Sequence, residues 1–414
     1  MSINAMKNKL IILSPIVIPF STVPMFAIGS QAHITIFRAY FFLIIGFFLL
    51  DIAVKGRIII SSNIALKAFS FLVVYAFLLL CSIFWSDDSV RSTLYSSYYV
   101  FYLSFVFVFI SSNLSQKDIN VFYNLWLLTS IVVGLMCFFE IYFGHRFPGS
   151  RYFDAERVSL APTASFHNEN NLAVYLAVTS LFFYAKLHDV NFLLKIIINL
   201  VLLYFLFIVV ITESRGSLLI FAFGFCIYLF FSGKISWTIV LLKFALMLVI
   251  FIGLLFFIPD KLFLAIDEGV SVIENDARVI LLKNAFTAMS ENNFFGVGAG
   301  GIESYNARLG NVEVENTHNW FGEVVANTGI IGGFIWISAF TFVFFASLHV
   351  FKYGDVYFKA CFFVFLLFPF WQSIVSSMIQ FSMFWIFLSV FLKQIDLEFY
   401  RQASQKNCRF VRVM

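Results

Sequence analysis

One histidine of this sequence stands where a helix is expected to begin. The segment at residues 315–320 (ENTHNW) leads into a long apolar run, and Glu323 follows shortly after. Asn316 or Thr317 is expected to cap the helix, which would place His318 in its first turn. A helix N-terminus lowers the basicity of imidazole, and a general base at neutral pH must be neutral imidazole. His318 is therefore a candidate base, although a histidine at such a place is more often only a hydrogen-bonded cap.

A second candidate site is the shortest connection in the chain, residues 212–217 (TESRGS), which joins two apolar runs. Ser214 or Ser217 is expected to cap the following helix, which places Arg215 near its N-terminus. Free helix amides, the helix dipole and the guanidinium fork all favour the same ligand, a phosphate. The simpler alternative is an ion pair between Glu213 and Arg215 at the membrane interface.

A third candidate is an amphipathic helix expected at about residues 271–290. Its apolar face carries residues at helical spacing, namely Val272, Ile273, Ala277, Ile280, Leu281, Ala285 and Met289. The positions off that face are Glu274, Asn275, Arg278 and Asn284. Such a helix is expected to lie flat on the membrane interface, with Arg278 at the height of lipid phosphates. An arginine that only reaches ordinary phospholipid headgroups explains these residues equally well.

A glycine-rich run follows at residues 294–301 (FFGVGAGG), and Gly296, Gly298 and Gly301 formally satisfy a G-x-G-x-x-G pattern. A dinucleotide site needs a preceding strand within a βαβ unit, and this sequence offers none, so we reject that site. An ordinary loop is the favoured interpretation. The alternative is a turn whose backbone amides approach a ligand.

The composition sets the class of protein that must position these groups. The 414 residues are 61% hydrophobic and only 12% charged, about half the charge that a soluble domain carries. This is a membrane protein. The formal net charge of +4 is small, and nucleic acid is not an expected partner. The five cysteines are scattered without CxxC spacing, so neither a disulfide framework nor a metal site is expected.

We expect an all-α polytopic membrane protein, because each span needs roughly 20 apolar residues. About twelve transmembrane helices are predicted, at 10–28, 36–54, 64–85, 94–112, 120–143, 170–187, 192–211, 216–232, 236–258, 320–350, 357–373 and 375–393. The run at 320–350 is expected to bend at Gly329, Gly332 or Gly333. The predicted organisation is nine helices in 1–258, a large loop with the amphipathic helix at 259–319, three helices in 320–393 and a tail at 394–414. The first run also fits a cleaved signal peptide.

The distribution of basic residues predicts the orientation. With both termini in the cytoplasm, the inner loops hold a series of cations, namely Lys55, Arg57, Lys117, Lys186, Lys234 and Lys352. The outer cations gather in the turn of Arg215, in the long loop and at 144–169, where Arg146, Arg151 and Arg157 lie. Ionisable groups at the outer ends of the spans indicate a polar chamber that opens to the extracytoplasmic side.

The order of these pieces resembles the bacterial O-antigen ligase and Wzy-type polysaccharide polymerase superfamily. The resemblance covers roughly Phe166 to Phe334: the Ser-Arg-Gly turn, the Ala-Arg segment of the long loop, the Phe-Gly-x-Gly run and the His-Asn helix start. The segment at 165–171 (SFHNENN) also resembles a motif of this superfamily, which often carries proline where Glu169 stands.

The resemblance implies transfer of a glycan from an undecaprenyl-diphosphate-linked oligosaccharide to an acceptor hydroxyl, at the periplasmic face of the bacterial inner membrane. No metal or other cofactor is implied. His318 would deprotonate the acceptor, Arg215 and Arg278 would hold the diphosphate, and the anomeric carbon would invert. Residues expected to support the site or bind the acceptor are Arg157, His167, Asn168, Glu213, Asn319, Glu323, Gly296 and Gly298.

Two activities share these motifs. A polymerase of O-antigen or another surface polysaccharide joins repeat units, whereas an O-antigen ligase transfers the glycan to the lipid A core during lipopolysaccharide biosynthesis. The Phe-rich, Gly- and Pro-poor chain and the stretch at 167–171 favour a polymerase, with membrane lipid and a chain-length regulator protein as further candidate partners. A flippase or other polysaccharide transporter is the alternative of another class. It is disfavoured because transporters bind substrate near the midplane, whereas the charges here lie at the outer ends.

Overall fold

The computed structural model describes residues 2–28, 32–56, 63–153, 161–231, 277–310, 319–373 and 381–411. Within these ranges the chain is helical except for its connections and one two-stranded hairpin. Seven helical segments are long and apolar enough to cross a membrane, and two shorter apolar helices accompany them. The chain is therefore an all-α, multi-pass membrane protein, as its composition predicts.

The helices run in chain order as follows: α1 (Ile3–Leu13), the 3₁₀ helix η1 (Ser14–Phe20), α2 (Ile36–Lys55), α3 (Asn63–Ser82), η2 (Ile83–Trp85), α4 (Ser89–Ile110), α5 (Gln116–Phe143), α6 (Glu169–Lys186), α7 (Phe192–Ile211), α8 (Arg215–Phe231), α12 (Ala277–Glu291), α13 (Gly301–Leu309), α14 (Trp320–Val350), α15 (Val356–Leu366), α16 (Phe368–Trp371) and α17 (Ser382–Val411). Eight of the expected spans, from 36–54 to 216–232 and at 320–350, coincide with α2 to α8 and α14 to within a few residues. The span expected at 236–258 lies outside the described residues.

The predicted bounds of the first span are wrong. The helix begins at Ile3, changes to the 3₁₀ helix η1 at Ser14, and gives way to a strand, β1 (Pro24–Ile28). This strand pairs antiparallel with β2 (Ala32–Thr35). Pro15 and Pro19 lie in η1, and proline removes a backbone donor and crowds the preceding turn. The proline spacing therefore ends the α-helix before residue 28.

The boundary expected between residues 393 and 394 falls inside a helix. α17 continues without a break from Ser382 to Val411. Beyond that boundary it still packs in the bundle, since the buried Asp396 carboxylate accepts the Ala65 amide at 3.1 Å. Just before it, Lys393 donates to the Ile110 carbonyl oxygen at 3.3 Å. The first turns past residue 393 are thus part of the helical body.

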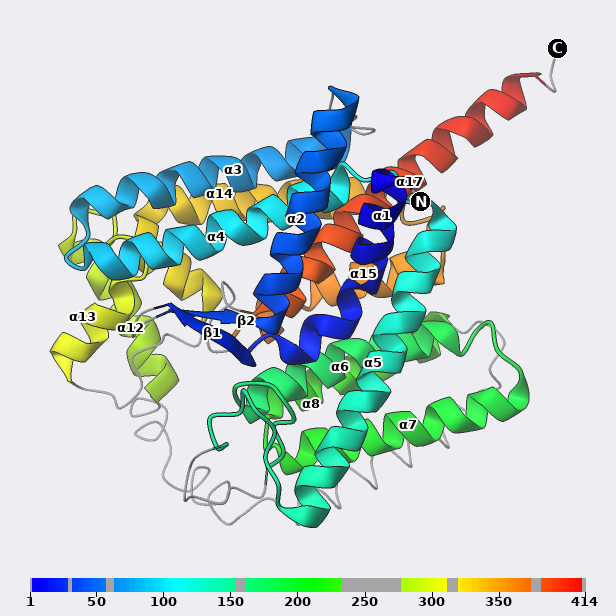
Figure 1. Ribbon diagram of the computed structural model, residues 1–414, viewed down its shortest axis with the longest axis horizontal. Helices are drawn as coiled ribbons and strands as arrows, with labels where there is room; N and C mark the ends of the chain where they lie inside the picture. The colour runs from blue at the N-terminus through cyan, green and yellow to red at the C-terminus, as the bar shows by residue number, and fades with distance from the viewer. Residues whose placement is uncertain are drawn as a thin grey trace.

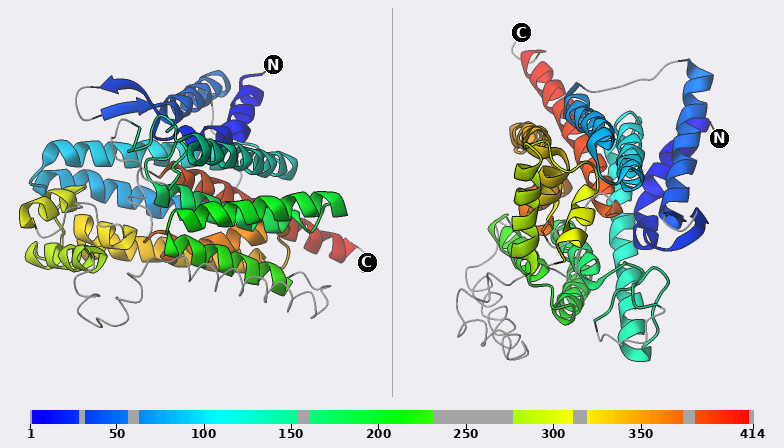
Figure 2. Two further views of the ribbon diagram at one scale, coloured as in Figure 1. Left: turned by 90° about the horizontal axis from the view of Figure 1, so that it is seen from below. Right: turned by 90° about the vertical axis from the view of Figure 1, so that its left-hand side faces the viewer.

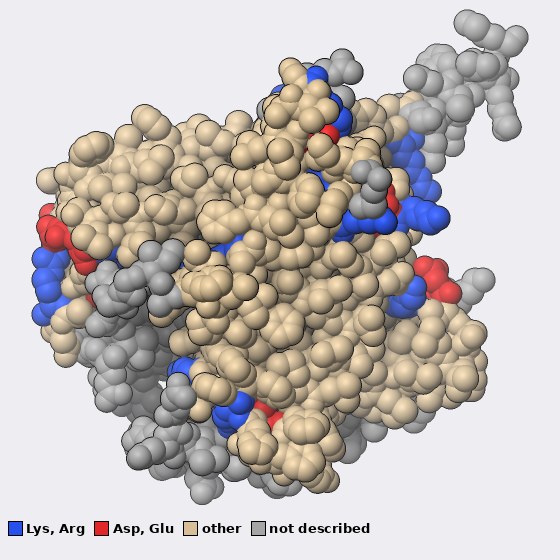
Figure 3. Space-filling model, viewed as in Figure 1, with Lys and Arg blue, Asp and Glu red and all other residues tan. Residues whose placement is uncertain are grey.

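Helices distant in sequence lie side by side in two groups (Figure 1). α14 packs on α3, and α17 packs on α4, while α6 packs on α8 and α15. The second view shows that most helices share one direction, so the connections gather at two opposite ends (Figure 2). On the face shown in Figure 3, charged side chains lie at the edges and the middle is almost bare of them. This is the distribution that a chain crossing an apolar layer requires.

A buried carboxylate organises the connection between α5 and α6. Glu140, in the last turn of α5, accepts the backbone amides of Thr163 at 2.6 Å and Ala164 at 2.8 Å. The Arg146 guanidinium lies 3.4 Å from the same carboxylate and donates to the Ala161 carbonyl oxygen at 2.8 Å. Glu140 is only 3% exposed. One charge therefore fixes both ends of the 144–169 loop.

We predict that Glu140→Gln lowers the free energy of unfolding by about 3 kcal/mol, because two buried amides lose a charged acceptor and Arg146 loses its counter-ion. Thermal unfolding of the purified protein in detergent measures the effect. Glu169→Gln is the matched control, since Glu169 pairs with Arg151 nearer the surface, where a pair contributes at most about 1 kcal/mol. Equal shifts in the two variants would contradict the role given to Glu140.

Candidate functional site

The turn that carries Arg215 is as short as predicted. α7 ends at Ile211 and α8 begins at Arg215, so only three residues connect them. Glu213 reverses the chain in a left-handed conformation, with φ of 53°. The Ser214 and Ser217 hydroxyls lie 2.9 Å apart, and Leu218 donates its amide to the Ser214 carbonyl oxygen at 3.1 Å.

Arg215 is exposed at the first position of α8. Among the residues that the structure describes, neither Glu213 nor Arg215 has an ion-pair partner, so the alternative of an ion pair between them is not realised. A cation at a helix N-terminus that has no counter-ion among the described residues is suited to an external anion.

The helix expected at about 271–290 is α12, which begins at Ala277; residues 271–276 and the side chain of Arg278 lie outside the described part. Leu281, Ala285 and Met289 of the apolar face are buried within the protein, whereas this face was expected to lie on the membrane interface. Asn284 is also buried, which corrects its predicted place off the buried face. Its amide donates to Asn306 Oδ1 of α13 at 2.9 Å. Protein therefore covers this face, because α12 packs on both α13 and α14.

The glycine run 294–301 packs against a break in α14. Gly329 has φ of 66° and ψ of −161°, so the bend predicted at one of three glycines occurs there. The amides of Val297 and Gly298 donate to the Ala326 and Asn327 carbonyl oxygens at 2.8 and 2.9 Å. The Ile330 amide donates back to the Phe294 carbonyl oxygen at 3.1 Å. These two amides of the run thus bind the protein itself.

Gly296 and Gly298 let this segment approach closely. Both have positive φ, 78° and 87°. A Cβ at Gly296 would lie 2.5 Å from the Ala326 carbonyl oxygen, and one at Gly298 would lie 2.5 Å from the Ser86 side chain. Their role as ligand-binding positions stays a prediction, while their role in packing is visible.

The start of α14 differs from the prediction. Its N-cap is Asn319, whose Oδ1 accepts the Gly322 amide at 2.8 Å, and not Asn316 or Thr317. Gln372 accepts the next two donors, the Trp320 amide at 3.4 Å on its carbonyl and the Phe321 amide at 3.0 Å on its side chain. The first turn of α14 therefore begins after His318, which itself lies outside the described residues. Asparagine is as good a cap as threonine, so local sequence could not choose between them.

Glu323 lies in the first turn of α14 and is 1% exposed. The Tyr95 hydroxyl of α4 donates to its Oε1 at 2.6 Å. Tyr95 was not a predicted site residue. The signal in the sequence is the helical spacing of Tyr95, Tyr99 and Tyr102 in an apolar segment, which indicates one buried face with hydroxyl groups.

Ion pairs hold α13 to the start of α4. Arg91 lies 3.5 Å from Glu303 and donates to the Ser304 hydroxyl at 3.2 Å, and Arg308 lies 2.8 Å from Asp87. At the other side of α13, the Tyr305 hydroxyl donates to Glu291 of α12 at 2.6 Å. Burial raises the pKa of Tyr305 to about 12, and this hydrogen bond is the next largest cause. Residue spacing along the chain does not indicate these long-range pairs.

A cavity of about 400 Å³ lies beside the start of α14. Its lining comes from α12, α14, α16 and the residues next to them, namely Leu282, Phe286, Asn319, Trp320, Phe321, Val324, Trp336, Ile337, Phe340, Thr341, Phe368, Pro369 and Gln372. Most of this wall is apolar or aromatic. Trp320 is 3% exposed, and its indole N–H has no acceptor among the described residues. A ligand with an apolar chain fits such a wall.

The cavity borders the elements that carry the predicted site residues. Arg278 occupies the helical position one turn before Leu282 on α12, and His318 directly precedes Asn319. α8, which begins at Arg215, contacts α16. The structure therefore places α12 and the start of α14 around one cavity, and α8 against a helix that also lines it. The side chain of Arg278 and the whole of His318 lie outside the described residues.

The segment 165–171 has its own set of contacts. Asn168 caps α6 by accepting the Asn171 amide at 2.8 Å, and the exposed His167 accepts the Arg151 amide on its carbonyl at 2.9 Å. Partial desolvation, aided by the Arg151 guanidinium, lowers the pKa of the His167 imidazole. Thr22 donates to the Ser165 carbonyl oxygen at 2.6 Å, so this segment also contacts the N-terminal region. Arg157 lies outside the described residues.

Two comparisons with known proteins bear on this arrangement. Residues 200–337 match the family model described as O-antigen ligase, a segment that runs from α7 into α14 and includes Arg215, Arg278 and His318. The chain is also 25% identical, over 276 residues, to the teichuronic acid biosynthesis protein TuaE of Bacillus subtilis strain 168. That match covers 63% of this chain and 56% of the relative, so it spans little more than half the relative's length. These matches confirm the resemblance to the O-antigen ligase and Wzy-type superfamily.

We predict that Gly329→Ala detaches the segment 294–298 from α14, because a Cβ there would lie 1.8 Å from the Phe294 carbonyl oxygen and φ is left-handed. Stability is expected to fall by about 3 kcal/mol, with faster proteolysis near residues 292–300. Gly46→Ala in α2 is the control, since a Cβ there meets nothing within 4 Å. Unchanged unfolding and proteolysis of Gly329→Ala would show that the close packing is not needed.

Proposed function

We propose that this protein is an integral membrane glycan transferase that acts on undecaprenyl-diphosphate-linked oligosaccharides, and that it polymerises O-antigen or another surface polysaccharide. The observation that carries the proposal is the O-antigen ligase match at residues 200–337, because it contains the turn of Arg215, α12 and the start of α14. α12 and the start of α14 line an apolar cavity of about 400 Å³, which suits a lipid-linked substrate. α8 contacts α16, which also lines this cavity.

The proposed reaction is a single displacement. His318 takes the proton from the acceptor hydroxyl, whose oxygen attacks the anomeric carbon of the donor from the face opposite the diphosphate. The bond between that carbon and the diphosphate oxygen breaks, the diphosphate leaves with the electron pair, and the anomeric carbon inverts. Arg215 and Arg278 bind the diphosphate and neutralise the charge that develops as it leaves.

The described residues hold the first turn of α14 in position. Asn319 and Gln372 fix the first turn of α14 directly after His318, and the Tyr95 hydroxyl fixes Glu323 within that turn. A base held by a capped and buried helix start loses little freedom when substrate binds, which lowers the entropic part of the barrier. No step of this reaction needs a metal ion.

We propose that the site faces the periplasm from the inner membrane. The support is electrostatic, because cytoplasmic loops carry the excess of lysine. Lys55 and Lys186 are the last residues of α2 and α6. Lys7 pairs with Asp51 near the end of α2, and Lys393 donates to Ile110, the last residue of α4. The turn of Arg215 and the start of α14 lie at the opposite ends of their helices. A chain-length regulator protein is a candidate partner on the periplasmic side.

A polymerase is preferred to a ligase on the composition of the chain and on the segment 167–171. The relative's name refers to teichuronic acid biosynthesis, and it supports a role in making a polysaccharide without fixing which one. The ligase remains the second candidate because the family match is described as O-antigen ligase. The transporter alternative gains no support from either comparison.

We predict that His318→Ala lowers kcat for lipid-linked repeat units by about 10²–10⁴-fold, because the acceptor loses its base. Arg215→Lys and Arg278→Lys are expected to lower kcat about 10²-fold or more, since lysine lacks the bidentate fork. Product length by gel and mass spectrometry of the purified enzyme is the measurement. Arg308→Lys, at an exposed ion pair of α13, is the control. Full activity of His318→Ala would reject the mechanism.

Deleting the gene separates the two candidate activities. Loss of a polymerase leaves glycans of a single repeat on the acceptor, whereas loss of a ligase leaves no glycan attached. Transport of unchanged lipid-linked units, with no lengthening or transfer by the purified protein, would replace both with the transporter.

A further inference from the structure

An arginine at the start of α2 is fixed in place without a described counter-ion. Thr35 caps α2 by accepting the Arg38 amide on its hydroxyl at 3.3 Å, which sets Arg38 in the first turn. The Arg38 guanidinium donates to the His33 carbonyl oxygen of β2 at 2.6 Å and lies 4.1 Å from the centre of the Tyr98 ring of α4. Among the residues that the structure describes, no carboxylate lies within ion-pair distance of Arg38.

This geometry differs from that of an arginine that only reaches ordinary headgroups. Such a side chain keeps its rotamer freedom until it binds an anion. Arg38 is already oriented by the His33 carbonyl and by the Tyr98 ring, so it loses little freedom on binding. A guanidinium that the described residues orient and do not neutralise is suited to an external phosphate.

Toward the middle of the bundle the surface beside Arg38 becomes apolar. Phe42, one turn further along α2, is 54% exposed, and its ring centroid lies 4.9 Å from that of Phe101 on α4. The contacts of Arg38 with Tyr98 and of Phe42 with Phe101 are thus one turn apart between the same two helices. Both helices are long and apolar enough to cross a membrane. A ligand with its phosphate at Arg38 and its chain along Phe42 is therefore a membrane lipid.

Arg38 lies at the end of the bundle where the start of α14 also lies. The hairpin that precedes α2 is at the end away from both chain termini (Figure 2). On α4, Tyr98 follows three residues after Tyr95, and Tyr95 donates to Glu323 in the first turn of α14. Positions three apart on a helix are neighbours, so Arg38 and the start of α14 contact adjacent positions of α4.

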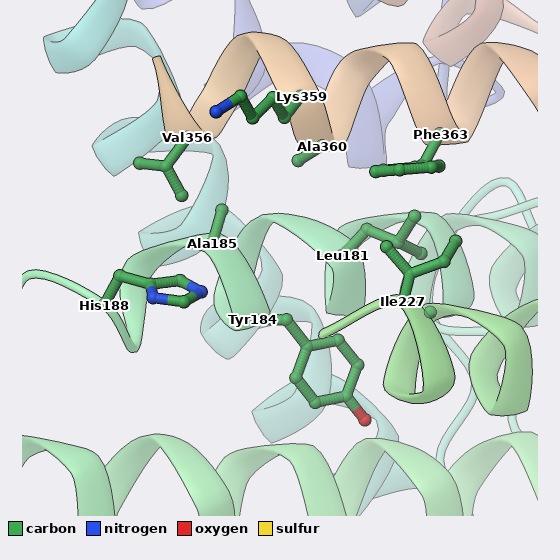
Figure 4. Close-up of a pocket in the computed structure, with 10 residues that line it drawn as sticks. Leu181, Tyr184, Ala185, His188, Ile227, Val356, Lys359, Ala360 and Phe363 are labelled. Carbon is green, nitrogen blue, oxygen red and sulfur yellow. The ribbon is translucent and has the colours of Figure 1, made fainter. Parts of the chain in front are cut away.

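The cavity of about 310 Å³ between α6, α8 and α15 offers no comparable site (Figure 4). His188 and Lys359 line it, but acidic and basic residues around them balance each other. The acidic residues are Asp189, Asp355 and Glu398, and the basic ones are Lys195, Lys359 and Arg401. That cavity therefore has no charge preference, whereas Arg38 selects an anion.

We propose that Arg38 and Tyr98 bind the diphosphate of the lipid-linked acceptor, which rests on the proposed polymerase function. In that reaction both substrates are lipid-linked, and the attacking hydroxyl belongs to the end of the acceptor saccharide remote from its lipid. The acceptor diphosphate must then lie about one repeat unit away from the base, at the same face of the membrane. Arg38 meets this condition, because it lies at the level of the start of α14 with residues of α4 in contact with each.

The first test counts the copies of undecaprenyl diphosphate that bind the full-length protein in detergent, by native mass spectrometry. The wild type is expected to bind two copies, and Arg38→Gln and Arg215→Gln one copy each, since each variant weakens one site about tenfold. Arg308→Gln is the matched control, because it removes an exposed arginine of the same end that is paired with Asp87. It is expected to bind two copies.

The second test compares a lipid-linked repeat unit with the same saccharide free of lipid as acceptors. Arg38→Gln is expected to lower transfer to the lipid-linked acceptor about tenfold at limiting concentration and to leave transfer to the free saccharide unchanged. A wild-type protein that transfers glycan to neither acceptor contradicts the proposed function itself. Transfer by the wild type that Arg38→Gln leaves unchanged with both acceptors contradicts only the acceptor site.

Two outcomes of the binding test would overturn the proposal. One is two copies bound to Arg38→Gln. The other is an equal loss of dioleoyl-phosphatidylglycerol and undecaprenyl diphosphate in that variant, because the site would then hold ordinary phospholipid. Inorganic pyrophosphate that binds as tightly as the lipid would also count against it, since the chain would contribute nothing. If Arg38→Gln fails to fold, Tyr98→Leu decides, with binding expected to weaken about fivefold through the loss of the stacked ring.

Discussion

The break in α14 at Gly329 is the constraint from which the arrangement around the site follows. A helix that leaves helical geometry inside an apolar body frees backbone donors and acceptors that water cannot reach. Here the segment 294–298 supplies the missing partners, with amides for the carbonyls of Ala326 and Asn327 and a carbonyl for the amide of Ile330. The connection between α12 and α13 is therefore required by α14, and cannot be regarded as an independent loop.

The contact of segment 294–298 with α14 also positions the two helices that flank this segment, α12 and α13. α12 packs with Ala285 and Ala288 against Val297 and Ala326, and these small residues let the backbones come close. α13 leaves toward α4, where two ion pairs hold it. The start of α14, its Glu323 carboxylate bound by α4, thus faces α12 across the apolar cavity. Helices far apart along the chain, α4 and α12 to α14, are thus held together around the irregular backbone at Gly329.

The sequence predicted what depends on local composition. Apolar runs gave most of the spans, because length and burial in lipid leave only helices as a solution. The turn at Arg215 was predicted because three polar residues between two such runs allow no other connection. Asn284 was misplaced because its partner, Asn306, lies in another helix. The cap at Asn319, the role of Tyr95 and the packing of Gly296 likewise depend on contacts between distant segments, which one sequence does not encode locally.

The position of the charges favours the proposed glycan transfer at an interface over transport. A transporter that carries a polar glycan must offer polar groups along the route through the apolar layer, and buried ionisable residues then mark that route. Among the described residues, the buried Lys7 and Asp51 lie 2.9 Å apart beside Lys55, and Glu323 lies in the first turn of its helix. The described middle of the bundle is instead filled by aromatic contacts, such as Trp385 stacked on Tyr102 with ring centroids 5.5 Å apart. A core closed by such rings separates the end of the bundle where Arg215 and the start of α14 lie from the opposite end, as the proposed reaction requires.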